Sequence, residues 1–124
     1  MSQKILVADD EPNIVISLEY LLKREGYTVL IARDGQEALE TIAREQPDLV
    51  LLDVMMPKKT GFEVCQSVRA SDKLQATKIL MLTARGRDTD VTKGLALGAD
   101  AYITKPFSTR ELVQKVAQML AGSA

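Results

Sequence analysis

The sequence contains no histidine and only one cysteine, Cys65, among its 124 residues. Without histidine the chain has no imidazole for a Ser–His or Cys–His catalytic pair, and none to bind a metal. A single cysteine cannot form an internal disulfide, so the sequence suits a reducing compartment and predicts a cytoplasmic location. Histidine-dependent hydrolysis and histidine-containing metal sites are therefore excluded.

Long apolar runs and an excess of one charge are also missing. The longest apolar stretches, residues 49–52 and 79–82, are far too short to cross a bilayer. The N-terminus runs from apolar residues straight into acidic ones and does not resemble a signal peptide. The net charge of -1 lacks the basic excess of a nucleic-acid-binding face. We therefore expect no membrane partner and no direct contact with nucleic acid.

The remaining composition, 46% apolar and 27% charged residues, is ordinary for a globular protein with a buried core. A chain of 124 residues has room for one domain but not for two. We expect a single domain over residues 1–124, with an ordered core of about 3–121 and a frayed end or linker stub after it.

Short β-type runs alternate along the chain with longer segments whose apolar residues have helical spacing. The runs are Lys4–Ala8, Thr28–Ala32, Leu49–Leu52, Lys78–Leu82 and Ala101–Thr104. Runs that are apolar throughout are typical of strands buried on both faces of a parallel sheet. Pro12 suits a first helical turn, and Ser108 with Glu111 has the spacing of a capping box. The pattern predicts an α/β fold, a doubly wound parallel sheet with helices on both faces.

Polar residues punctuate these runs at their carboxyl ends. They are Asp9 and Asp10 after the first run, Asp53 closing the third, Thr83 after the fourth and Lys105 after the fifth. The second run has no comparable group close to its end. If the second strand lies at the edge, strand order 2-1-3-4-5 brings the other four ends together. Ligands of such sheets bind where the strand order reverses, which is where Asp10 and Asp53 would meet.

This set of side chains has a definite chemistry. Crowded carboxylates repel one another, and a hard divalent cation such as Mg²⁺ relieves the repulsion. Lys105 supplies a cation and Thr83 a hydroxyl, and both suit phosphate oxygens. Asp53 would then be a carboxylate nucleophile supported by a metal and a cation.

Each residue also has a purely structural interpretation. Asp9 and Asp10 suit a helix N-terminus, Asp53 a turn, Thr83 a cap and Lys105 a solvated surface. Capping alone does not explain why such residues follow the first, third, fourth and fifth runs but not the second. The joint pattern therefore favours a phosphate and metal site.

Five short segments carry the most specific motifs. They are Leu6–Glu11, Leu51–Pro57 with Gly61, Leu82–Ala84, Gly98–Tyr102 and Lys105–Phe107. In this order they resemble the receiver domains of bacterial response regulators over essentially the whole chain. The resemblance implies a flavodoxin-like, chemotaxis-regulator-like phosphoacceptor domain of a two-component phosphorelay, which signals by conformational change and is not a conventional enzyme.

The resemblance also implies roles for individual residues. Asp53 would accept the phosphoryl group, and Thr83 and Lys105 would bind its oxygens. Asp10 would bind Mg²⁺ directly and Asp9 through water, and the carbonyl of Met55 would supply a further ligand.

The family's conformational switch and cis peptide are implied in the same way. Movement of Thr83 toward the phosphoryl group would let the ring of Tyr102 turn inward. Lys105–Pro106 would be a cis peptide, the one type of bond in which cis costs little.

A phosphorelay requires partners. Because the chain has no histidine, the phosphoryl donor must be a sensor histidine kinase, a phosphotransfer protein or a small phosphodonor. The signal would pass to a downstream protein target or an output domain, whether the receiver is stand-alone or excised from a longer chain. In one subfamily the domain dimerises through the face formed by its fourth helix, fifth strand and fifth helix, using acidic residues just before the switch tyrosine. Asp100 matches this pattern, but Ala101 stands where that subfamily usually has a second acid.

Met55 and Arg85 lie two positions after Asp53 and Thr83, where the family tunes hydrolysis of the phosphoryl group. The apolar Met55 offers no acceptor to orient an attacking water. A persistent phosphoryl state is therefore expected.

Two other classes share parts of the pattern. A flavodoxin-like cofactor binder needs a Ser-, Thr- or Gly-rich loop after the first strand, but residues 9–12 would repel anions. A phosphohydrolase of the haloacid dehalogenase type carries its nucleophile after the first strand in a D-x-D pattern. The sequence Asp9-Asp10-Glu11 lacks that spacing.

Overall fold

The computed structural model describes residues 3–84 and 86–121, so Arg85 lies outside the described residues. In chain order the elements are β1 (Lys4–Ala8), α1 (Pro12–Arg24), β2 (Thr28–Ala32), α2 (Gly35–Glu45), β3 (Leu49–Asp53), α3 (Gly61–Arg69), the 3-10 helix η1 (Asp72–Leu74), β4 (Lys78–Ala84), α4 (Asp88–Ala96), β5 (Ala101–Lys105) and α5 (Thr109–Ala121). No helix in these two stretches is both long and apolar enough to span a membrane.

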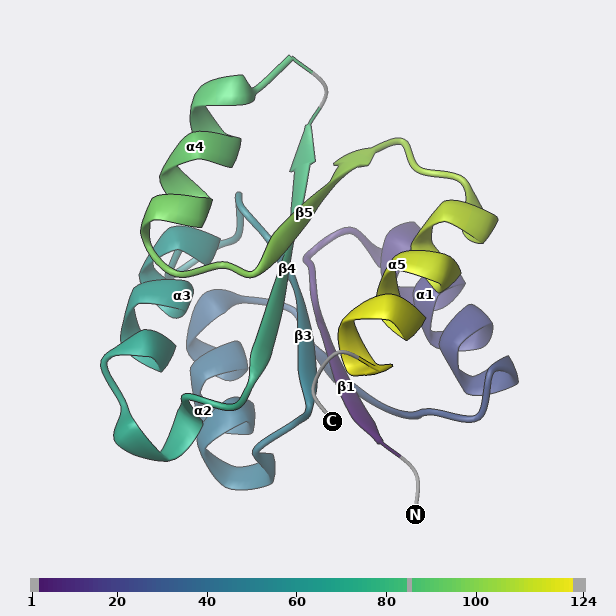
Figure 1. The fold of residues 1–124 in the computed structure, drawn as a ribbon, viewed down its shortest axis with the longest axis horizontal. Helices are drawn as coiled ribbons and strands as arrows, with labels where there is room; N and C mark the ends of the chain where they lie inside the picture. The colour runs from purple at the N-terminus through teal and green to yellow at the C-terminus, as the bar shows by residue number, and fades with distance from the viewer. Residues whose placement is uncertain (1–2, 85, 122–124) are drawn as a thin grey trace.

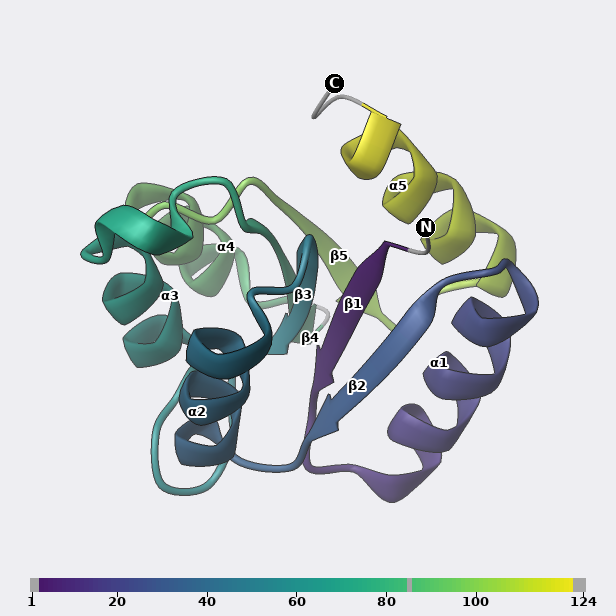
Figure 2. The same cartoon turned by 90° about the horizontal axis from the view of Figure 1, so that it is seen from below.

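The strands form one parallel sheet in the order β2-β1-β3-β4-β5. Figure 1 shows α2, α3 and α4 on one side of this sheet and α1 and α5 on the other, and Figure 2 shows the same layers after a quarter turn. The predicted doubly wound fold and its strand order are confirmed. The order reverses between β1 and β3, which places the expected ligand-binding edge at the carboxyl ends of these two strands.

Side chains of the inner strands alternate between two apolar cores. Leu6 and Ala8 of β1 pack in the core beneath α2 and α3. Ile5 and Val7 pack in the opposite core, beneath α1 and α5. Burial of each large aliphatic side chain contributes about 1.5–3 kcal/mol, so both helical layers hold the sheet firmly. Away from their ends the inner strands are apolar, as expected for strands whose two faces are both covered by helices.

The strands extend further than their apolar residues predict. β3 includes Asp53, β4 runs to Ala84 and β5 includes Lys105. In the β4–β5 ladder, Thr83 pairs with Thr104 and Ala84 with Lys105. The expectation that Thr83 and Lys105 follow their strands was therefore wrong, because backbone hydrogen bonds continue the ladder whatever the side chains are. Both residues are held by the sheet itself.

Capping interactions fix where the helices begin. Pro12 is the first residue of α1, and the Ser108 hydroxyl accepts a hydrogen bond of 3.0 Å from the Glu111 N–H at the start of α5. A complete capping box lies at α3, where Thr60 and Glu63 exchange hydrogen bonds of 3.1 and 3.2 Å. This box directly follows the loop after β3 and fixes where that loop ends.

Candidate functional site

The residues predicted to form a site meet at the carboxyl edge of the sheet. Asp9 and Asp10 follow β1, Asp53 ends β3, Thr83 lies near the end of β4 and Lys105 ends β5. The strand that contributes no residue, β2, lies at the edge of the sheet. Strand order therefore brings Asp9, Asp10, Asp53 and Lys105 together, and it places Thr83 near the end of the neighbouring strand β4.

Three carboxylates form the centre of this group. Asp9, Asp10 and Asp53 each present an oxygen, and these oxygens lie within 4.8 Å of one another. Asp9 is fully buried and accepts a hydrogen bond of 2.9 Å from the Glu11 N–H. Crowded oxygen donors in a partly desolvated position are what a hard divalent cation requires. The donor set therefore fits Mg²⁺.

Lys105 is the cation that balances this charge in the structure. Its Nζ lies 2.7 Å from Asp9, 3.1 Å from Glu11 and 3.5 Å from Asp53. Burial alone would lower the pKa of Lys105, but the hydrogen bond to Asp9 and the charges of Asp53 and Asp9 raise it above its usual value. Lys105 therefore remains an ammonium group. The peptide bond that follows, Lys105–Pro106, is cis.

Asp53 has an unusual protonation equilibrium. Burial, and then the negative charge of Asp9, raise the pKa of Asp53 to about 7. Lys105 and the backbone of Met55 act in the opposite direction and lower it. A nearby cation favours the ionised form of a carboxylate, so a bound metal would lower the pKa of Asp53.

Thr83 and Tyr102 lie on neighbouring strands. Thr83 is buried, and its hydroxyl donates a hydrogen bond of 3.5 Å to the carbonyl of Ile103 in β5. The Tyr102 side chain is 43% exposed, so its ring lies at the surface. In this structure the hydroxyl is engaged by the sheet and the tyrosine faces outward.

The loop between β3 and α3 is pinned directly behind Asp53. The Gly61 N–H donates a hydrogen bond of 2.8 Å to the carbonyl of Val54. A Cβ at Gly61 would overlap the carbonyl of Asp53, well inside the 3.0 Å limit of real contacts. Only glycine allows α3 to begin this close to the end of β3.

The same loop is held a second time by the start of α2, a contact that the sequence does not predict. The Gly35 N–H donates a hydrogen bond of 3.2 Å to the carbonyl of Pro57, and a Cβ at Gly35 would overlap Lys59. Asp34 caps α2 and pairs with Lys58 at 3.6 Å. The Asp-Gly dipeptide was a visible turn signal, but its partner lies in a different loop.

Asp53 lies in a cleft of about 330 Å³. Besides Asp10, Asp53 and Lys105, its lining includes Met55, Arg87 and Asp90. Met55 is 66% exposed, so its side chain is accessible at the mouth of the site. The Arg87 guanidinium pairs with Asp90 at 2.9 Å. This ion pair could not be predicted from the sequence, because nothing in the local pattern places the start of α4 beside Asp53.

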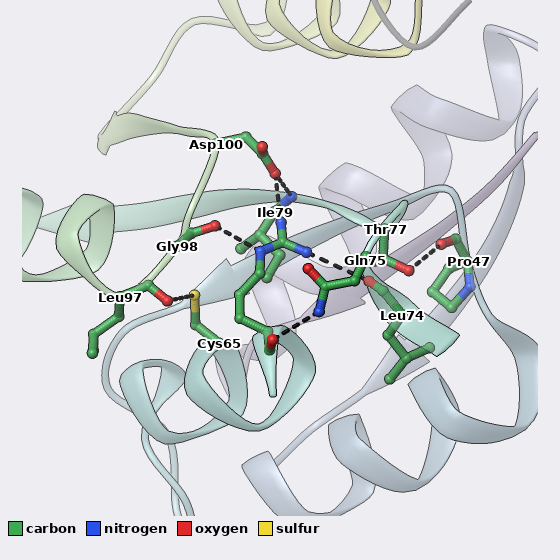
Figure 3. Close-up of polar contacts among 10 residues, drawn as sticks. Pro47, Cys65, Leu74, Gln75, Thr77, Ile79, Leu97, Gly98 and Asp100 are labelled. Atoms are coloured by element: carbon green, nitrogen blue, oxygen red, sulfur yellow. Dashed lines mark hydrogen bonds and ion pairs between the residues drawn. The ribbon is translucent and has the colours of Figure 1, made fainter. Parts of the chain in front are cut away.

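Asp100, a candidate for contacts between two copies of the chain, is bound within its own chain. Its Oδ2 accepts hydrogen bonds of 2.8 Å from the Arg69 guanidinium and of 2.8 Å from the Ile79 N–H. Arg69 also donates a hydrogen bond of 2.8 Å to the carbonyl of Gly98. Figure 3 shows Asp100, Ile79 and Gly98 in this network. An intermolecular salt bridge at Asp100 would have to compete with these bonds.

Comparison with known proteins adds independent information. Residues 5–117 match the family model for the response regulator receiver domain. A Chloroflexus aurantiacus protein assigned as a response regulator is 36% identical, with a TM-score of 0.93 over 98% of this chain and 99% of that one. Chemotaxis response regulator CheY4 of Vibrio cholerae is 34% identical, with a TM-score of 0.90 over 96% of this chain and 99% of that one.

A third solved structure is informative about the metal. The receiver domain of sensor histidine kinase PA1611 from Pseudomonas aeruginosa is 28% identical, with a TM-score of 0.89 over 98% of this chain and 99% of that one. That structure has a magnesium ion coordinated in its active site cleft.

The family match runs from the first strand into the last helix, and the solved relatives cover nearly the whole chain. This match supports the receiver interpretation over a flavodoxin-like cofactor binder and over a phosphohydrolase. The chain belongs to the response regulator receiver domain family and is a signalling domain of a two-component system.

Proposed function

We propose that this receiver accepts a phosphoryl group on Asp53 and signals by a change of conformation. The observation that carries the proposal is the position of Asp53: it lies at the end of a central strand, beside two carboxylates and 3.5 Å from the Lys105 ammonium. The whole of residues 1–124 would act as one such domain. The relation of this domain to an output, as a stand-alone regulator or as part of a longer chain, is a separate question.

The metal would be Mg²⁺. Asp10 and Asp53 would bind it directly, Asp9 would bind it through water, and the Met55 carbonyl would complete the protein ligands. When bound, Mg²⁺ supplies positive charge against the carboxylates and the incoming phosphoryl oxygens. The crowded donor oxygens and the magnesium ion in the PA1611 receiver support this assignment.

Phosphoryl transfer would use Asp53 and Lys105 of the cleft together with Thr83 of the neighbouring strand end. A carboxylate oxygen of Asp53 attacks phosphorus in line, and a new O–P bond forms as the P–N bond of a phosphohistidine breaks. The departing imidazole nitrogen keeps the electron pair and takes a proton from solvent. Lys105 offers its ammonium group and Thr83 its hydroxyl to the phosphoryl oxygens. These two groups stabilise charge that grows as the bond changes.

The phosphoryl donor would be another molecule. The chain has no histidine, so the phosphohistidine must belong to a sensor histidine kinase or a phosphotransfer protein. A small phosphodonor such as acetyl phosphate would serve in its place. The acyl phosphate formed on Asp53 is labile, so the signal would end by slow hydrolysis.

The signal would leave the site through Thr83 and Tyr102. The Thr83 hydroxyl would leave the Ile103 carbonyl and turn to the phosphoryl group, and the exposed ring of Tyr102 would move inward. This change would alter the face formed by α4, β5 and α5, where a downstream protein, an output domain or a second copy of the chain would bind.

Labelling with acetyl phosphate tests the proposal. The unchanged protein should take up one phosphoryl group in the presence of Mg²⁺ and none after chelation of the metal. Asp53→Ala should abolish labelling, whereas Asp72→Ala, which removes an exposed carboxylate of η1, should leave it intact. Labelling of Asp53→Ala at the rate of the unchanged protein would overturn the proposal.

A further inference from the structure

A second cation lines the cleft in addition to Lys105. Among the described residues around the cleft, the basic side chains are those of Lys105 and Arg87. The ammonium of Lys105 is shared by three carboxylates, whereas the Arg87 ion pair joins it to one, Asp90. Of the two cations, Arg87 is therefore the one that is not already paired with Asp53 and its neighbouring carboxylates.

The Arg87–Asp90 pair has the geometry of a two-point contact. Nε of Arg87 lies 2.9 Å from Oδ2 of Asp90, and a second guanidinium nitrogen lies 3.4 Å from Oδ1. The Arg87 side chain is 55% exposed, while that of Asp90 is 14% exposed. Because Arg87 is the more exposed of the two partners, a more highly charged anion in the same cleft can compete with Asp90 for its guanidinium group.

Phosphorylation of Asp53 creates such an anion. A phosphoryl group brings about 1.5–2 negative charges into a lining that already contains Asp10, Glu11 and Asp90. The planar guanidinium group pairs with phosphate oxygens through two parallel hydrogen bonds, and such charge-assisted bonds are roughly twice as strong as neutral ones. The balance of charge in the cleft therefore favours movement of Arg87 toward the acceptor.

We propose that Arg87 binds the phosphoryl group, and that Arg87 stays paired with Asp90 until Asp53 is phosphorylated. The inference rests on the proposed function, because it requires a phosphoryl group on Asp53. Since Arg87 is the residue immediately before α4, the exchange of partners would also connect the state of Asp53 to the start of that helix.

The simpler alternative is that the Arg87–Asp90 pair only stabilises the first turn of α4. The two roles differ in what they change. A purely structural pair affects the melting temperature of the unphosphorylated protein but not its affinity for a phosphoryl group. A phosphoryl-binding Arg87 changes that affinity, and removal of its competitor Asp90 changes it in the opposite direction.

Titration with beryllofluoride in excess Mg²⁺, followed by NMR, tests the inference because this anion imitates an aspartyl phosphoryl group. Arg87→Ala should weaken beryllofluoride binding by about tenfold, and Arg87→Lys should recover part of the loss because it keeps the charge but not the fork. Asp90→Asn should tighten binding by about threefold, as expected for loss of a competing ion pair. In the double variant Arg87→Ala/Asp90→Asn, that gain should disappear.

Controls separate this inference from the proposed function. Arg110→Ala removes the same charge from an exposed position of α5 and should leave the affinity unchanged. Affinities of Arg87→Ala and Asp90→Asn that both lie within about twofold of the unchanged protein would overturn the role of Arg87 while leaving Asp53 as acceptor. A tightening by Asp90→Asn that persists without Arg87 would also overturn it. Failure of the unchanged protein to bind beryllofluoride would overturn the proposed function, and this inference with it.

Discussion

The ammonium group of Lys105 lies 2.7 Å from a carboxylate oxygen of Asp9, although the two residues are 96 positions apart in the sequence. Asp9 is fully buried, so this ion pair joins the ends of the first and the last strand inside the protein. Lys105 lies further from the proposed acceptor, at 3.5 Å from Asp53. In the resting state Lys105 is therefore shared among Asp9, Glu11 and Asp53 and is not paired with Asp53 alone.

Removal of this cation should affect metal binding and phosphorylation in opposite directions. Lys105→Met leaves three crowded carboxylates without their cation, so we expect Mg²⁺ to bind about tenfold more tightly to the unphosphorylated protein. The same variant should be phosphorylated more slowly, because a group proposed to stabilise the phosphoryl oxygens is gone. Calorimetric titration with Mg²⁺ and the rate of labelling measure the two effects.

The control for this prediction is Lys73→Met, which removes an exposed charge from η1. It should change neither quantity. Weaker Mg²⁺ binding by Lys105→Met would show that Lys105 organises the carboxylates and does not compete with the metal.

The stability of the metal-free protein should depend on pH through Asp53. Burial and the charge of Asp9 raise the pKa of Asp53 to about 7, against 3.8 for an ordinary aspartate. Between these values the folded state binds a proton that the unfolded chain has lost, so stability falls as the pH rises from about 4 to 7. At pH 8 without Mg²⁺, Asp53→Asn should therefore be more stable than the unchanged protein by about 2–4 kcal/mol.

Urea unfolding across this pH range provides the measurement. The stability difference between the two proteins should shrink toward zero near pH 4, where both side chains are neutral. A difference that stays constant with pH would contradict the raised pKa of Asp53.

The loop behind Asp53 should tolerate no Cβ at Gly61. Gly61→Ala forces a methyl group into the carbonyl of Asp53, so we expect a loss of about 1–3 kcal/mol of stability together with weaker Mg²⁺ binding. Gly26→Ala is the matched control, because Gly26 has a φ of 95° but open space around its Cβ position. It should cost stability and leave Mg²⁺ affinity unchanged. Equal Mg²⁺ affinities for Gly61→Ala and Gly26→Ala would contradict an effect of this loop on metal binding.

The side chain at position 55 should set the lifetime of the phosphoryl group. Met55 is exposed in the cleft lining and has no acceptor with which to orient an attacking water. Met55→Asn supplies a carbonyl and an amide at the same place, so dephosphorylation should become faster. The decay of labelled protein after removal of acetyl phosphate measures this rate. An unchanged or slower decay would argue against a role for Met55 in the persistence of the signal.

The strand ends show what the sequence could predict. Continuous apolar runs identified the inner strands, and the polar residues at their ends, such as Asp9 and Asp53, indicated one shared edge. These predictions succeeded because burial on two faces and parallel strand order act over whole elements. The run ends themselves were less well predicted, since backbone pairing carries Thr83 and Lys105 into their strands.

Contacts between separate loops escaped prediction for a different reason. The approach of Gly35 to Lys59 and the presence of Arg87 beside Asp53 depend on how distant elements pack, and no local pattern encodes them. Asp100 was considered for contacts with a second copy, but its bond to Arg69 depends on the position of α3. The spacing of Thr60 and Glu63 is that of a capping box, but this box was not predicted.

The proposed role of Asp53 is tested most directly by mapping the phosphoryl group itself. The protein would be treated with acetyl phosphate and Mg²⁺, and the modified residue located by mass spectrometry of its peptides under conditions that preserve acyl phosphates. We predict a single adduct, on Asp53, that is absent without Mg²⁺. An adduct on another residue, or none under conditions that phosphorylate a known receiver, would contradict the proposal.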